Sequence, residues 1–295
     1  SAETGAAVQG AGGDVSLLVG VGDELDGGNL VGVAGETKAA AQTGGVVATT
    51  AGQGSSTAIE GGGSGGAVVV TGGTALGYDN ITNTGGDVFV TGGTASTARG
   101  GNAHMVSGKS GGTSSGELYF GSADSGMIGM SGGVTVSTGD ATSGHSGRVD
   151  LQTGDAVQGG GGDITMAVGA SSSDSGGDIV ATAGIARSEG DRGGDIEMRG
   201  GSSASGTGGS VMVLSGVSNT TNSGAVVLST AGSGSQGVSG GIQSSTGGSL
   251  AGSSGYVEMT SGDAVGGAGG DINLVVGAGD SGDGGDTVMG AGHTS

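Results

Sequence analysis

Aspartate is the residue whose type and spacing in this chain could do chemistry. It directly follows a Gly-Gly pair at seven places, and several of these lie one repeat apart along the chain. Carboxylates stacked about 5 Å apart, the spacing of adjacent β-strands, repel each other unless a cation neutralises them. The sequence therefore predicts a weak cation ladder, with Ca²⁺ as the candidate ion, at Asp163, Asp178, Asp195, Asp271 and Asp286. The alternative is that each Asp accepts backbone N–H bonds at a turn.

Glycine-rich loops that bind phosphate or calcium are the next candidates. Matches to G-x-G-x-x-G are expected by chance among 80 glycines, and the motif needs a following helix, whereas apolar alternation follows here. The segment 266–274 superficially resembles a calcium-binding nonapeptide. Its bulky residue, Ile272, stands one position after Asp271 instead of two, so the likeness fails.

Catalytic groups are scarce in this sequence. The three histidines, His104, His145 and His293, do not recur in the repeat, and the chain has no cysteine and five aromatic residues. No nucleophile is paired with a base, and no set of residues has the spacing of a zinc site. We predict that the protein is not an enzyme, with no catalytic or cofactor-binding residues.

Charge and hydropathy exclude two classes of partner. The net charge is −20 and only seven residues are Lys or Arg, which excludes nucleic acid and anionic lipid surfaces. No apolar run approaches the ~20 residues of a membrane helix, so no membrane insertion is predicted. The chain starts at Ser1 inside an ordinary repeat turn, which predicts a processed or partial segment of a longer protein.

The elements that would position these residues come from a short repeat. We define the anchor glycine as the second residue of the Gly-Gly or Ser-Gly pair before each apolar run. There are eighteen anchors, and in eleven of the seventeen intervals the next anchor stands fifteen positions later. They are Gly13, Gly28, Gly45, Gly66, Gly86, Gly101, Gly116, Gly132, Gly147, Gly162, Gly177, Gly194, Gly209, Gly224, Gly240, Gly255, Gly270 and Gly285.

The run after each anchor alternates with period two. The second position after the anchor is Val, Ile or Leu in sixteen units, and the seventh is Gly in sixteen. Alternation of this kind indicates a strand with one buried face. We therefore predict an all-β fold, a single parallel β-solenoid of about 18 short coils over 1–295, with longer loops at 53–64 and 73–84. A 108-residue super-repeat of seven units relates 115–177 to 223–285.

Two surface features bear on partners. Alternation points Val69, Phe89, His104 and Tyr119 outward in consecutive units, which predicts a lateral contact stripe unless a loop covers it. Asn80 and Asn219 stand in N-x-Thr sequons. They are predicted glycosylation sites, which would make the chain secretory and would make glycans possible partners.

Segments such as SGRVDLQTGDAVQGGGGDITMAVGASSSDSGGDI (146–179) carry a family likeness. They resemble the large Gly/Ser-rich tandem-repeat cell-surface proteins of stramenopile algae, the diatoms and brown algae, and more loosely the Gly-rich repeats of phage fibres. The resemblance implies an extracellular or cell-surface location and brings no catalytic residues.

The function expected from these observations is that of an extracellular structural repeat protein. It would assemble with itself, head to tail or laterally, into a filament, sheath or cell-surface appendage, because uncapped repeat ends propagate. The alternatives are an ice-binding β-solenoid, for which Thr50, Thr71 and Thr91 make one short row, and an adhesin shaft or cation-binding surface module.

Overall fold

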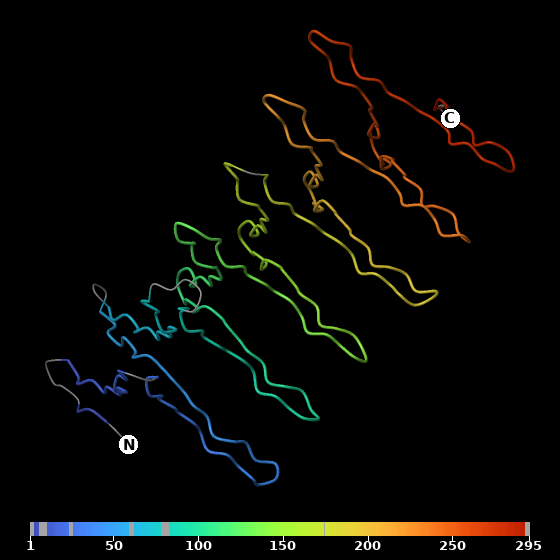
Figure 1. Cartoon of the computed structure of the whole chain (residues 1–295). Helices are drawn as coiled ribbons and strands as arrows, with labels where there is room; N and C mark the ends of the chain where they lie inside the picture. Colours follow the sequence, from blue (N-terminus) through green and yellow to red (C-terminus); the bar gives the residue numbers. More distant parts are fainter. Residues whose placement is uncertain are drawn as a thin grey trace. The chain divides into compact units, whose positions relative to one another are not determined.

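The structure is a computed structural model that describes residues 3–5, 11–23, 26–58, 62–77, 83–173 and 175–292. The chain falls into two compact parts, Ser1–Asp150 and Leu151–Ser295, each of which contains many of the short repeat units. Within a repeat unit the chain follows an apolar run, bends, and comes back so that the next anchor glycine lies beside the end of that run (Figure 1). We call the segment between the end of a run and the next anchor a return turn. A search of the described residues for a helix long and apolar enough to cross a membrane finds none.

The predicted β-solenoid is wrong. The described residues contain neither a strand nor a helix. A parallel solenoid needs backbone hydrogen bonds from each run to the run of the next unit. The backbone bonds of the described residues instead lie within single return turns. The prediction of one continuous domain over 1–295 and of longer loops stays a prediction.

The reason for this difference lies in the side chains. No hydrophobic residue is buried among those described, so there is no core. Each unit has two bulky inward positions among many glycines, which give little area to bury against the high conformational entropy of glycine. The alternation itself is visible: Leu118 is 49% exposed and the next residue, Tyr119, is 85% exposed. Such a run therefore has a less exposed and a more exposed face, but no other described segment packs against the less exposed face.

Eight return turns are closed by one backbone hydrogen bond each. In each case the N–H of the anchor glycine donates to the carbonyl oxygen of the glycine that ends the preceding run, at 2.8–3.0 Å. The pairs of donor and acceptor are Gly45–Gly35, Gly66–Gly52, Gly86–Gly73, Gly101–Gly93, Gly116–Gly108, Gly194–Gly184, Gly209–Gly201 and Gly224–Gly216. The other ten anchors are described too, and none makes this bond. We call the two kinds closed and open turns.

The residue six positions after an anchor, which we call the closing residue, separates the two kinds. It is Gly, Ala or Ser in all eight closed turns, and the β-branched residues Val and Thr occur here only before open turns. In the open turn at Gly177, a methyl group placed on the anchor would lie 2.9 Å from Cγ1 of Val168. The branched side chain therefore fills the space in front of the anchor.

The tightest closed turns have glycine as the closing residue. A methyl group on Gly92 or Gly200 would overlap the carbonyl oxygen of the facing anchor, Gly101 or Gly209. With Ala183 the approach is looser, and that Cβ lies 3.5 Å from the position of a methyl group on Gly194. The series from Gly through Ala to Val indicates that side-chain bulk controls closure.

Turn length does not explain the difference. Gly93 and Gly101 close a turn across eight residues, and the open turn from Gly154 to Gly162 has the same length. Serine occurs in both kinds. The open turn after Ser122 has Ala123 in place of the end glycine, whereas nothing in the structure explains the open turn after Ser261.

The 108-residue super-repeat appears in the turns. Between Gly86 and Gly285 the order is three closed turns and four open turns, and then the same order again. Turn details recur at the same offset. The Ser110 hydroxyl accepts from the N–H of Thr113 at 2.9 Å, and the Ser218 hydroxyl accepts from that of Thr221 at 3.0 Å. Gly144 and Gly252 have φ values of 109° and 108°, a conformation that favours glycine.

Substituting Ala183→Thr should open the turn at Gly194. The added branch would displace the anchor and break a bond of about 1 kcal/mol, so the exchange protection of the Gly194 amide should fall about fivefold. Hydrogen exchange followed by NMR measures this directly. The control is Ala181→Thr, the same change two residues earlier, which should leave Gly194 protected. Equal protection in both variants would show that bulk at the closing residue does not control the turn.

Candidate functional site

The aspartates of the predicted cation ladder are all exposed. Asp195 already has a partner, because Nη2 of Arg192 lies 2.7 Å from its Oδ1 and 2.9 Å from its Oδ2. Asp163 and Asp178 make no ion pair with a described residue. Within the described ranges no three His, Asp or Glu residues come together as a metal site. The cation ladder, including Asp271 and Asp286, stays a prediction.

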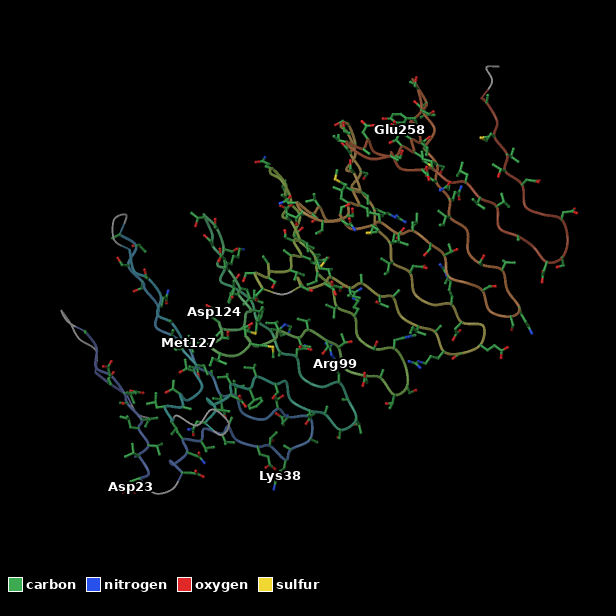
Figure 2. The ribbon with its side chains drawn as sticks, turned by 45° about the horizontal axis from the view of Figure 1, so that its top comes forward. Asp23, Lys38, Arg99, Asp124, Met127 and Glu258 are labelled. Atoms are coloured by element: carbon green, nitrogen blue, oxygen red, sulfur yellow. The ribbon has the colours of Figure 1, made fainter. Side chains whose placement is uncertain are left out.

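Four basic residues form ion pairs with carboxylates two or three residues away. Arg148 Nε lies 2.8 Å from Asp150, Arg199 Nε lies 2.7 Å from Glu197, and Lys38 Nζ lies 3.9 Å from Glu36. Figure 2 shows charged side chains such as Lys38 and Glu258 projecting from the ribbon. Exposed pairs of this kind contribute about 0–1 kcal/mol each. They neutralise charge locally and do not gather it into a site.

The predicted contact stripe is exposed in the structure. Val69, Phe89 and Tyr119 are 78%, 83% and 85% exposed, and His104 is exposed as well. No described loop covers these four side chains. Other large apolar side chains are also accessible, including Met127 in a return turn (Figure 2). The stripe is therefore available for a partner, although its role as an interface stays a prediction.

The open turns are a feature that reasoning from the sequence missed. At Gly162 the anchor N–H and the carbonyl of Gly154 are not bonded to each other, and neither residue carries a side chain. The same pairing is absent at Gly255, although the Thr246 hydroxyl donates to the Gly255 carbonyl at 3.3 Å. The signal was present as Val or Thr at the closing residue. The solenoid prediction treated that position as a minor part of an inward face.

The two sequons differ in what the structure describes. Asn80 lies outside the described residues. Asn219 is exposed in a turn that is ordered by its neighbours, because the hydroxyls of Ser218 and Thr221 are 2.9 Å apart and Ser218 also accepts backbone N–H bonds. The asparagine therefore stands on an accessible, locally fixed loop, the setting that a glycosylation acceptor needs.

Neither the arrangement nor the comparisons add a catalytic centre to this description. The described residues form no pocket. Comparison of the chain with protein-family models, with curated proteins and with solved structures found no match.

Replacing Phe89 and Tyr119 by Ser should weaken any association of the chain with itself by at least about tenfold, because burying one such side chain contributes roughly 1.5–3 kcal/mol. Sedimentation velocity over a concentration series measures the effect. The matched control replaces Ile128 and Val157 by Ser, since these apolar residues of return turns are even more exposed. If both double variants lose association equally, the stripe has no special role.

Expression in a eukaryotic secretory host should attach a glycan at Asn219. The Asn219→Gln variant should then lose the mass of one N-linked glycan, which mass spectrometry before and after glycosidase treatment detects. Asn222→Gln serves as the control, because Asn222 lies in the same turn but outside a sequon. An unchanged glycan mass in Asn219→Gln would contradict use of this site.

Proposed function

We propose that this chain is an extracellular structural repeat protein that assembles with copies of itself into a filament, sheath or cell-surface appendage. The observation that carries the proposal is the absence of a core among the described residues. The accessible area of the chain is 28882 Å², whereas a folded monomer of 26.7 kDa exposes only about 10,700 Å². Apolar side chains at regular positions in every run are part of this area, and association is the means by which they can be buried.

The spacing of the apolar side chains favours another copy as the partner. Over the eighteen units they recur most often at every fifteenth position. A partner that buries many of them at once must present complementary groups with the same period. Another copy of this chain meets that requirement by its own repeat, and repeat proteins gain stability by adding interfaces between like units.

Charge sets the conditions for such assembly. Each copy has a net charge of −20, so two copies repel each other at long range. Salt screens this repulsion within about 8 Å at physiological ionic strength. Carboxylates that make no ion pair with a described residue, such as Asp163 and Asp178, are also the groups that a divalent cation would neutralise. A saline medium outside the cell fits this requirement.

Three further features support an extracellular location. They are the exposed sequon at Asn219, the low number of Lys and Arg residues that leaves few sites for trypsin-like proteases, and the resemblance to algal cell-surface repeats. None of them depends on how the assembly is built.

The chain should form particles larger than a monomer as ionic strength rises. Sedimentation velocity and electron microscopy at about 0.01 M and about 0.15 M NaCl compare strong and weak repulsion, with Debye lengths of roughly 30 Å and 8 Å. Assembly should be greater at the higher salt, and CaCl₂ at the same ionic strength should increase it further if the aspartates bind the ion. A chain that stays monomeric under all these conditions at high concentration would rule out self-assembly.

A further inference from the structure

We infer that the open turns are the points at which a second copy of the chain docks, and that the β-branched closing residues hold them open for this purpose. The inference rests on the self-assembly proposed above and adds which residues make the contact. It concerns most directly the four open turns at Gly240, Gly255, Gly270 and Gly285, which all lie in Leu151–Ser295. Three of them follow a β-branched closing residue, and the turn at Gly270 follows Ser261. We call residues 231–285 the open block.

The first support is the backbone itself. In a closed turn the anchor N–H and the end-glycine carbonyl satisfy each other, as Gly209 and Gly201 do at 2.8 Å. In the open block the equivalent N–H groups of Gly255, Gly270 and Gly285 make no hydrogen bond to a described residue. Unpaired donors and acceptors on an extended backbone are a template for pairing with another chain.

The second support is access. The anchors have no side chain, and neither do the glycines that end most runs, so another backbone can approach them closely. A methyl group placed on either end glycine, Gly262 or Gly277, would meet no atom within 4 Å, so the space beside them is empty. The same holds for the end glycine of a closed turn, Gly201, so the two kinds of turn are equally accessible to another backbone and differ in whether the anchor N–H is already bonded within the turn.

The third support identifies the occupant as a second copy. Three successive open anchors, Gly255, Gly270 and Gly285, stand fifteen positions apart, and open anchors with the same spacing recur one super-repeat earlier at Gly147, Gly162 and Gly177. A partner must present its own backbone groups at this interval to pair with all three. The accessible area is also sufficient, because the excess over a folded monomer of this mass is roughly 18,000 Å², whereas a standard interface buries about 1,600 Å².

The closing residues then act as positioning residues for assembly. Thr230, Thr246 and Val276 do not need to contact the second copy. Each keeps its anchor from pairing within its own turn, as the 2.9 Å approach between Cγ1 of Val276 and a methyl group placed on Gly285 illustrates. Small residues at these positions would let the turns close and remove the docking points.

The test is a triple variant of the full chain, Thr230→Ala, Thr246→Ala and Val276→Ala, which should close the turns at Gly255 and Gly285. The turn at Gly240 still has Ala231 in place of the end glycine, as the open turn after Ser122 has Ala123. Its critical concentration for assembly in about 0.15 M NaCl should be at least about tenfold higher than that of the unmodified chain, because each lost backbone bond contributes roughly 1 kcal/mol. The matched control is Thr260→Ala, Thr287→Ala and Val265→Ala. It makes the same chemical changes away from the closing residues and should assemble like the unmodified chain.

Hydrogen exchange provides a second readout that does not need the variants. On assembly the amides of Gly255, Gly270 and Gly285 should gain at least about tenfold protection, whereas those of Gly209 and Gly224, already bonded within their turns, should change much less. In the unassembled triple variant the amides of Gly255 and Gly285 should already be protected, because their turns have closed.

The outcomes separate this inference from the proposed function. An unmodified chain that never assembles contradicts both. A chain that assembles, but whose triple variant assembles as well as the control, contradicts only the role of the open turns. Equal gains of protection at open and closed anchors contradict it too, because the second copy would then not select the open backbone groups.

Discussion

The close approach of each anchor glycine to the end of the preceding run is the constraint on which the rest of this structure depends. It brings two backbone segments together where no side chain stands between them, and the bulk of the closing residue decides whether they bond. A methyl group on Gly200 would overlap the Gly209 carbonyl, whereas Cγ1 of Val168 occupies the space in front of Gly177. Steric bulk at one position in each repeat therefore separates the closed turns from the open turns that follow Val or Thr.

Much of the local organisation could be predicted from the sequence, because it depends on short-range chemistry. The anchors and the return turns follow from the positions of glycine. The super-repeat holds at the level of individual bonds and angles, as the matching turns at Ser110 and Ser218 and the φ angles of Gly144 and Gly252 show. Phe89 and Tyr119 are 83% and 85% exposed and the residues before them, Val88 and Leu118, are 53% and 49% exposed, so all four are exposed and the outward stripe stays a prediction.

The tertiary prediction failed because alternation defines two faces of a run without stating what covers either face. A β-solenoid was inferred on the assumption that Ile164, Met166 and Val168 would be buried against a wall of small residues. All three are exposed instead, because the glycine-rich wall does not pack on them. The cation ladder depends on the same assumption. The aspartates share a position in the repeat, but a shared position brings side chains together only when successive units stack.

The closed turns also have a mechanical consequence. Each is held by one hydrogen bond within its own turn, and no backbone bond among the described residues connects one turn with the next. Tension along the chain would therefore open the turns one at a time, without cooperativity. Each opening frees the stretch between end glycine and anchor to extend, up to a full span of roughly 27 Å for an eight-residue turn such as Gly93–Gly101. Such a chain would lengthen stepwise under load and shorten again when the load is removed, because each turn closes through a local contact.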